Sequence, residues 1–195
     1  MSEDTPGFDL LKDMSTLAFR RVGDSVPLAD VLHGARQGFP QFLGELYRRY
    51  RKQVLAFLER LAPTDAEDLC QEVFLKLPAT LASYEERGNF EGWLKRIAFN
   101  TYRTRRRSAD RRREDALGAD TAEEQLPGMG AVTREDLWSH ALAGMPEALR
   151  EAWVLHREGY QAGEIGEMTG ISAGAAATRL SRAREYLARR LPDLT

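Results

Sequence analysis

The chain has 195 residues, a formal net charge of -2 and 43% hydrophobic residues, a composition typical of a globular protein with one large domain or two small ones. No apolar run approaches the roughly 20 residues that a membrane span requires, which argues against membrane insertion. The single cysteine, Cys70, excludes an internal disulfide, and no Cys/His cluster has zinc spacing, so we expect neither a metal site nor a cofactor.

The first 26 residues mix Asp, Ser, Thr, Gly and Pro with scattered apolar residues and show no durable period. This pattern predicts a partly disordered N-terminal arm. The arm begins with acidic residues and lacks the basic start and apolar run of a secretory signal, so we expect a cytoplasmic protein.

Helical periodicity begins at Leu28, where apolar residues start to recur at intervals of three and four as far as Leu61. Pro63 opens a second predicted helix, with Thr64 as its N-cap and Glu67 at the capping-box position. Its expected core stripe is Leu69, Val73, Phe74 and Leu77. Pro78 is expected to end or bend this helix.

A third helix is predicted after a loop at residues 83–90, with Trp93, Leu94 and Ile97 on its core face. It runs into residues 103–113, which hold seven arginines against one aspartate, whereas residues 114–136 hold seven acids against one arginine. This change of sign suggests a boundary, and the aperiodic stretch at 116–130 is typical of a linker.

Helices resume near Thr133, where Leu137, Trp138, Ala141 and Leu142 form one apolar stripe. Residues 162–172 have the pattern of a helix-turn-helix. Ile165 and Met168 share a face, Gly166 allows a close helix crossing, and Gly170 supplies the turn. Ser172 is the expected N-cap of a following, arginine-rich helix. Strand signals are absent, so the predicted fold is all-α with two small helical modules.

Four motifs in this order resemble those of a bacterial sigma factor of the extracytoplasmic-function (ECF) group in the sigma-70 family. They are Asp65–Lys76, Phe90–Asn100, Met145–Arg150 and Arg179–Arg184. The resemblance covers about 28–110 and 133–191. It implies an arm at 1–26, a region 2-like domain at 27–112, a linker at 113–132 and a region 4-like domain at 133–195.

The resemblance implies an RNA polymerase sigma factor, which binds core RNA polymerase, melts the minus-ten promoter element with the first module and binds the minus-thirty-five element with the second. Promoter DNA and core polymerase are the implied partners, and an anti-sigma partner is left open. The expected polymerase contacts are Asp65, Asp68, Gln71, Glu72 and Phe74.

The expected DNA contacts fall in two groups. For the minus-ten element they are Asn89, Arg96, Asn100, Arg103 and Arg106, with the loop at 85–89 receiving a flipped base. For the minus-thirty-five element they are Ser172, Thr178, Arg179, Arg182 and Arg184.

The chain departs from the family pattern at two places. Thr104 stands where Asp or Asn is frequent, and three alanines, Ala175–Ala177, precede Thr178 where relatives carry longer side chains. We therefore expect minus-thirty-five recognition to rely on Thr178, Arg182 and DNA shape.

The sequence leaves three alternatives to a sigma factor, namely a transcriptional regulator, a sigma-like adaptor and an enzyme. A helix-turn-helix transcriptional regulator explains the C-terminal module but leaves the Asp65–Lys76 and Phe90–Asn100 motifs unexplained. A sigma-like adaptor that has lost promoter recognition is compatible with the alanine-rich helix. The three histidines belong to no catalytic or metal-binding pattern, so we do not expect an enzyme.

Overall fold

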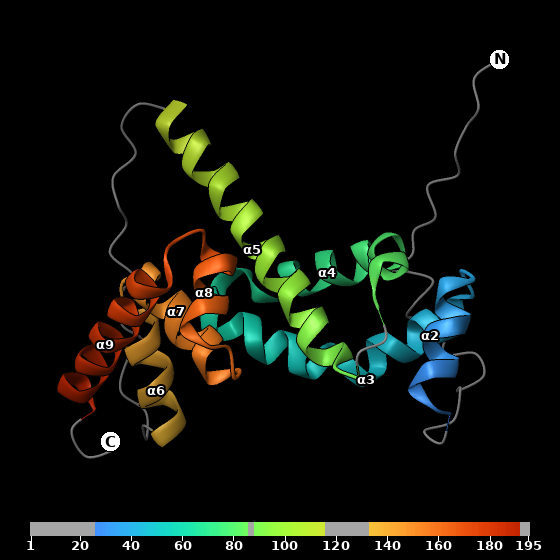
Figure 1. Cartoon of the computed structure of the whole chain (residues 1–195), viewed down its shortest axis with the longest axis horizontal. Coiled ribbons are helices and arrows are strands. Elements are labelled where there is room, and N and C mark those ends of the chain that lie inside the picture. Colours follow the sequence, from blue (N-terminus) through green and yellow to red (C-terminus); the bar gives the residue numbers. More distant parts are fainter. Residues whose placement is uncertain (1–25, 86–87, 116–132, 192–195) are drawn as a thin grey trace. The chain divides into compact units, whose positions relative to one another are not determined.

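The computed structural model describes residues 26–85, 88–115 and 133–191, and these residues form helices and no strands. The helices appear in chain order in Figure 1. They are α2 (Leu28–Arg36), α3 (Pro40–Leu61), α4 (Ala66–Thr80), α5 (Phe90–Asp115), α6 (Arg134–Ala143), α7 (Glu147–Arg157), α8 (Ala162–Thr169) and α9 (Ala173–Arg190). Short 3-10 turns, η1 (Pro63–Asp65) and η2 (Leu81–Ser83), stand on either side of α4. The all-α prediction is confirmed.

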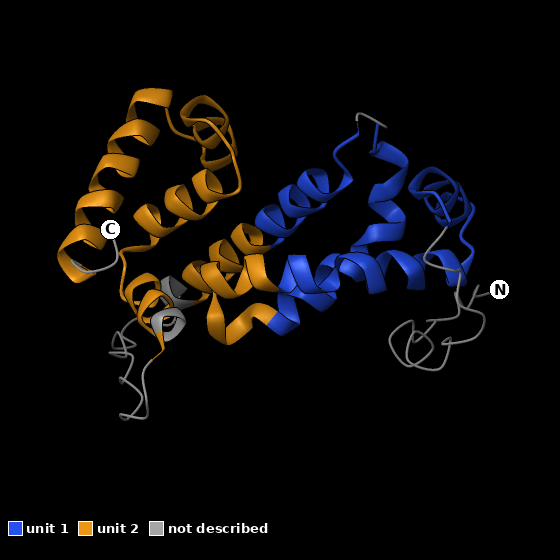
Figure 2. Ribbon diagram, turned by 90° about the horizontal axis from the view of Figure 1, so that it is seen from below, with its two compact units in different colours: residues 1–55, 67–101 blue, residues 56–66, 102–195 orange. Residues whose placement is uncertain are grey.

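Contacts divide the chain into two compact units, coloured in Figure 2. Unit 1 comprises residues 1–55 and 67–101, and unit 2 comprises residues 56–66 and 102–195. The boundaries at 55/56 and 101/102 fall inside α3 and α5, so each of these two helices contributes one part to each unit. The expected N-terminal arm and most of the expected linker lie outside the described residues.

Unit 1 is held together by an apolar core from α2, α3, α4 and α5. Its buried side chains include Val31, Leu32, Leu46, Val54, Leu69, Val73, Leu77, Leu81, Phe90, Leu94, Ala98 and Phe99. Burial of aliphatic and aromatic side chains at helical spacing is the main stabilising contribution to such a bundle. The spacing of these residues is what the sequence predicted for α3 and α4.

The start of α5 is fixed by an aromatic cluster and an arginine. The rings of Tyr84 and Phe90 lie 5.1 Å apart, and those of Tyr84 and Trp93 lie 4.9 Å apart. Arg36 on α2 donates a hydrogen bond to the Tyr84 carbonyl oxygen at 2.6 Å. These contacts position the chain just before α5, where the expected minus-ten residues begin.

In unit 2, α9 packs against α7 and α8, and its second half closes a core with α6. That core contains Ala141, Leu142, Met145, Ala183, Leu187 and Leu191. Arg150 on α7 donates to the Ala143 carbonyl oxygen at 3.0 Å, and the Tyr186 hydroxyl donates to the Gly144 carbonyl oxygen at 2.5 Å. Both bonds satisfy carbonyl groups at the end of α6.

The helix-turn-helix geometry follows the sequence prediction closely. Gly170 adopts φ +73° at the end of α8, and the Ser172 hydroxyl accepts a hydrogen bond from the Ala175 amide at 3.2 Å. A Cβ placed on Gly166 would lie 2.7 Å from the Ile171 carbonyl oxygen. The close approach at Gly166 is therefore made by the turn itself, not by a crossing helix as the sequence suggested.

Four local predictions need correction. The second predicted helix begins at Ala66 after the turn η1, so Thr64 is not its N-cap, and Glu67 instead pairs with Arg51 at 2.8 Å. Pro78 does not end the helix as one of the two expected outcomes had it, because it lies inside α4, which continues to Thr80. The remaining two corrections concern apolar residues that the sequence predicted to lie in the core. Trp93 and Ile97 on α5 are only partly buried, and Leu137 on α6 is 43% exposed. The interior positions on α5 are Leu94, Ala98, Phe99 and Tyr102, and those on α6 are Ala141 and Leu142.

Candidate functional site

The expected polymerase-binding residues form an exposed polar face on α4 and the turn before it. Asp65, Asp68 and Gln71 are exposed and Glu72 is half-buried, with its carboxylate 2.6 Å from the Lys76 ammonium. Phe74 differs from the expectation, because it is only 4% exposed and its ring packs against Tyr47 at 4.9 Å. The structure places Phe74 in the core of unit 1, where its side chain is not available to a partner.

Leu75 is a residue of this face that the sequence reasoning missed. Its side chain is 44% exposed. It follows Asp68 by seven residues and Gln71 by four, which places all three on one side of α4. The signal in the sequence was an apolar residue outside the Leu69, Val73 and Leu77 stripe.

Three of the expected minus-ten residues lie at the start of α5 or in its first half. Asn89 directly precedes the helix, and its side-chain oxygen accepts a hydrogen bond from the Gly92 amide at 2.8 Å, so Asn89 serves as an N-cap. Arg96 and Asn100 are exposed and four residues apart, hence on one face of α5. The expected base-binding loop at 85–89 lies partly outside the described residues.

The second half of α5, within unit 2, is bonded to α7 and α8 by three side chains. Tyr102 donates to one carboxylate oxygen of Glu147 at 2.7 Å, and Arg106 donates to the other at 2.5 Å. Arg103 donates to the Met168 carbonyl oxygen at 2.7 Å, at the C-terminal end of α8. We call this set of contacts the α5 clasp. It engages two of the five expected minus-ten residues, Arg103 and Arg106.

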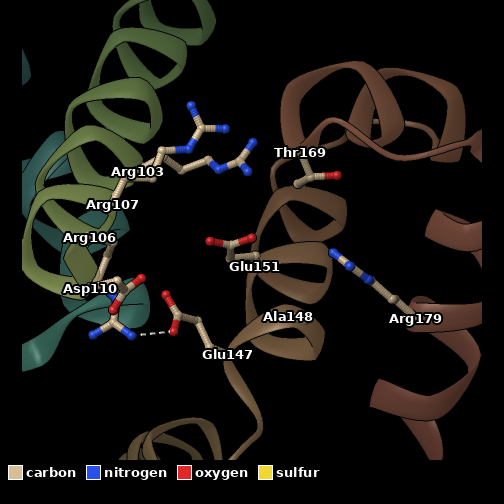
Figure 3. A pocket seen from close by; sticks show the side chains of 9 residues that line it. All are labelled: Arg103, Arg106, Arg107, Asp110, Glu147, Ala148, Glu151, Thr169 and Arg179. Atoms are coloured by element: carbon tan, nitrogen blue, oxygen red, sulfur yellow. Dashed lines mark hydrogen bonds and ion pairs between the residues drawn. The ribbon is translucent and has the colours of Figure 1, made fainter. Parts of the chain in front are cut away.

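A cavity of about 370 Å³ lies beside the α5 clasp. It brings together four arginines, Arg103, Arg106, Arg107 and Arg179. Three carboxylates, Asp110, Glu147 and Glu151, face the same space (Figure 3). The guanidinium and carboxylate charges in this cavity partly neutralise one another. The arginines come from both helices that are predicted to contact DNA, α5 and α9.

Glu151 is the most buried carboxylate of this cluster, with 9% of its surface exposed. Burial raises the pKa of its carboxyl group, and the nearby Glu147 acts in the same direction. Arg103 and Arg179 oppose this rise, since a nearby positive charge favours the carboxylate. Burial outweighs these two arginines, so the pKa of the Glu151 carboxyl group lies above its usual value.

The expected minus-thirty-five residues lie on more than one face of α9. Ser172, Thr178 and Arg182 are exposed, and the Thr178 hydroxyl donates to the Gly174 carbonyl oxygen at 2.9 Å. Arg184 is also exposed and has a guanidinium nitrogen 3.2 Å from His156 Nε2. Arg179, by contrast, is half-buried and lines the cavity. The first turn and a half of α9 exposes only small side chains at Ala173, Gly174, Ala175 and Ala177.

Two family models match the chain in the order that these sites predict. Sigma-70 region 2 matches residues 46–112, and sigma-70 region 4 matches residues 136–187. The first match contains α4 and most of α5, and the second contains the helix-turn-helix.

Curated relatives give the same assignment. The chain is 35% identical over 153 residues to the ECF RNA polymerase sigma factor SigE of Mycolicibacterium smegmatis, which covers 73% of this chain and 59% of that protein. It is 35% identical over 169 residues to the RNA polymerase sigma factor CarQ of Myxococcus xanthus, covering 82% of this chain and 94% of CarQ. The chain therefore belongs to the ECF RNA polymerase sigma factors of the sigma-70 family. Sigma factors are transcription initiation factors that act without catalysing a reaction themselves.

Solved structures agree on the fold. The sigma factor RpoE of Bartonella quintana, in complex with the anti-sigma factor NepR, matches with a TM-score of 0.58 and 24% identity, over 77% of this chain and 97% of that one. CnrH, in complex with the cytosolic domain of CnrY, matches with a TM-score of 0.51 and 24% identity, over 85% of this chain and 97% of that one. Within the described ranges, no helix is long and apolar enough to cross a membrane.

Proposed function

We propose that this sigma factor divides its work between a region 2-like domain at 27–112 and a region 4-like domain at 133–195, joined by the segment at 113–132. The family matches at 46–112 and 136–187 fall inside these limits. The first domain binds core RNA polymerase and opens the minus-ten element, and the second binds the minus-thirty-five element. These activities require polymerase and chromosomal DNA, so the chain acts in the bacterial cytoplasm.

Core polymerase binds the α4 face. A row of acidic and amide side chains pairs with a basic surface on the polymerase; Asp65, Asp68 and Gln71 are exposed and Glu72 is half-buried. Leu75 extends this face with an apolar contact. The observation that carries the proposal is the presence of this face and a helix-turn-helix in one chain, each inside its own family match.

Promoter DNA contacts α5 and α9. Arg96 and Asn100 lie on one exposed face of α5, and the proposed minus-ten surface extends from Asn89 through Arg103 and Arg106. On α9, Arg182 and Arg184 contact backbone phosphates, while Ser172, Thr178 and the small side chains near the helix start approach the bases. Arg179 joins this surface once it leaves the cavity.

A sigma-like adaptor is a second candidate, favoured by the short side chains at the start of α9. Alanines can contact thymine methyl groups but donate no hydrogen bonds to base edges. An adaptor would bind core polymerase without directing transcription from defined start sites.

The test is run-off transcription with core polymerase on a library of promoter fragments. We expect transcripts with defined starts from the wild-type chain, and loss of both polymerase binding and transcripts with Asp68→Arg. Glu59→Arg is the matched charge reversal, since Glu59 is an exposed acid on a different helix, α3. Polymerase binding without any transcript would support the adaptor, and equal loss in both variants would remove the assignment of the α4 face.

A further inference from the structure

Phe39 is an aromatic side chain that the fold leaves in contact with solvent. It stands in the turn between α2 and α3, and 50% of its surface is exposed. Its backbone, by contrast, is fixed on both sides. The Phe39 amide donates to the Gly34 carbonyl oxygen at 3.2 Å, and the Phe39 carbonyl oxygen accepts from the Phe42 amide at 3.1 Å. The fold therefore presents this ring at a defined place on unit 1.

The end of α2 explains why the ring is exposed. Gly38 has φ +79°, and its amide donates to the Ala35 carbonyl oxygen at 3.0 Å. Together with the bond from Phe39 to Gly34, this forms a Schellman motif, in which these last two positions usually make an apolar contact. Here one of them is a glycine, and a Cβ on Gly34 would lie 2.2 Å from the Phe42 ring. Phe42 thus takes the place that would otherwise cover Phe39.

The turn that carries Phe39 is bonded to the segment before the expected base-binding loop. Arg36, three residues before Phe39, donates to the Tyr84 carbonyl oxygen at 2.6 Å and to the Leu81 carbonyl oxygen at 3.4 Å. Its guanidinium carbon also lies 6.0 Å from the centroid of the Tyr84 ring. Tyr84 directly precedes the loop to which the sequence assigns base capture. Phe39 is therefore close to the place where the captured base enters.

The charge around Phe39 is compatible with a nucleic acid strand. The sequence has no carboxylate between Asp30 and Glu45, and Glu45 is already bonded to two arginines. Arg36 supplies a positive charge near the ring, and its bonds to the two carbonyl groups use only two of the five N–H donors of a guanidinium. Proteins bind unpaired bases with this combination, because the ring stacks on the base and the cation pairs with a phosphate.

We propose that Phe39 and Arg36 form a stacking platform for single-stranded DNA, on which an unpaired base next to the captured base lies against the Phe39 ring. The inference rests on the proposed function, because it takes opening of the minus-ten element as given. It adds to that function two residues outside the sigma-70 region 2 match at 46–112. Stacking tolerates any base, so the platform stabilises the open strand without selecting a sequence.

The experiment measures the affinity of the complex between the full chain and core polymerase for a fluorescein-labelled forked DNA, in which the minus-ten strand is unpaired. A fully duplex fragment of the same sequence is the reference. We expect Phe39→Ala to weaken binding to the forked DNA at least about fivefold, which corresponds to about 1 kcal/mol. Binding to the duplex should change by less than about twofold, because base faces are covered there.

Two further substitutions separate stacking from a merely apolar contact. Phe39→Trp keeps an aromatic face and should bind the forked DNA at least as tightly as the wild type. Phe39→Leu keeps an apolar side chain without a ring and should behave like Phe39→Ala. Urea unfolding of the three variants shows whether a loss of affinity reflects a loss of fold, and we expect wild-type midpoints because the ring is exposed.

Equal affinity of the wild type and Phe39→Ala for the forked DNA overturns the platform, and so does wild-type affinity in Phe39→Leu. Weaker binding of Phe39→Ala to core polymerase in the absence of DNA also overturns it, because the ring then contacts the polymerase. A wild-type chain that sediments as a dimer, together with a monomeric Phe39→Ala, assigns the ring to self-association and overturns it as well.

Failure of the proposed function has a different signature. If the wild-type complex binds forked and duplex DNA equally and yields no transcript on any promoter fragment, the assignment of promoter opening fails. If the wild type prefers forked DNA and transcribes, but Phe39→Ala binds the forked DNA equally well, only the stacking platform fails.

Discussion

Arg106 on α5 donates a hydrogen bond to a carboxylate oxygen of Glu147 on α7 at 2.5 Å, although the two residues are 41 positions apart in the chain. The other oxygen of the same carboxylate accepts from Tyr102, whose side chain is only 1% exposed. This arrangement joins the arginine-rich half of α5 to the helix that precedes the helix-turn-helix.

Tyr102→Phe removes one donor from Glu147 and leaves the Arg106 bond in place. We expect the chain to lose about 0.5–1.5 kcal/mol of unfolding free energy, the net value of a hydrogen bond to a partly buried group. Burial and the bond to Glu147 both raise the pKa of the Tyr102 hydroxyl, so the phenol stays neutral at physiological pH. Urea unfolding is the measurement, and a change within 0.2 kcal/mol would show that this bond contributes nothing, well below its usual range.

The turn of the helix-turn-helix depends on a glycine in the left-handed region. Gly170→Ala should destabilise the chain by about 1–2 kcal/mol, because a Cβ penalises the φ of +73° found there. Gly163→Ala is the matched control within α8, where an added Cβ has open space around it. That substitution should stabilise by about 0.5–1 kcal/mol through helix propensity. Thermal unfolding of both variants checks the pair, and opposite signs are required.

Stability should depend on the ionisation of Glu151. Since burial raises the pKa of this carboxyl group, the folded chain holds its proton at pH values where the unfolded chain has released it. Its contribution is therefore most favourable at low pH and is lost as pH rises through the raised pKa. Gln resembles the neutral acid, so the stability of Glu151→Gln relative to wild type should increase as pH rises. Urea midpoints at several pH values test this, and a difference that shrinks with rising pH would contradict it.

Glu45 shows the opposite pH dependence. Burial alone would raise the pKa of its carboxyl group, but hydrogen bonds from Arg48 and Arg49 outweigh burial and lower it. These bonds measure 2.7 and 2.5 Å. Their stabilisation is present above the usual carboxyl pKa and is lost as pH falls through the lowered value. Glu45→Gln should cost about 1–3 kcal/mol at pH 7, and the cost should diminish in acid. A cost independent of pH would refute the assignment.

Phosphate binding by α9 predicts a difference between two exposed arginines of the same helix. Arg182→Ala should weaken binding to promoter fragments and reduce the dependence of log affinity on log salt by about one. Arg189→Ala, near the C-terminal end of α9, should change neither quantity. Titrations of the polymerase complex at several salt concentrations make the comparison, and equal slopes for both variants would exclude Arg182 as a phosphate contact.

Helix positions and the helix-turn-helix were largely predictable because they depend on local rules. Apolar spacing located α3 and α4, and Gly170 and Ser172 marked the turn and the cap. The degree of burial of single side chains was less predictable. Trp93 and Leu137 have the spacing of core residues, but Trp93 is only partly buried and Leu137 is exposed, because burial also depends on how neighbouring helices pack. The family resemblance places Phe74 on a binding surface, whereas its place in the apolar stripe of α4 correctly indicates the core.

The contacts of the α5 clasp could not be predicted from the sequence. Arg103 and Arg106 belong to a charged run that favours solvent exposure, and nothing local connects that run to Glu147 or Met168. Such pairings depend on how distant helices pack, and neither periodicity nor capping rules carry that information. The same holds for Arg179, which the sequence placed beside Arg182 but the structure places in the cavity.

We propose that this chain opens promoters together with core polymerase. Permanganate reactivity of thymines in the minus-ten element reports that opening directly, and the chain with core polymerase is predicted to make those thymines reactive, while core polymerase alone or with Asp68→Arg leaves them protected. Protected thymines with the wild-type chain, on a fragment that the complex binds, would contradict the account and identify the chain as an adaptor.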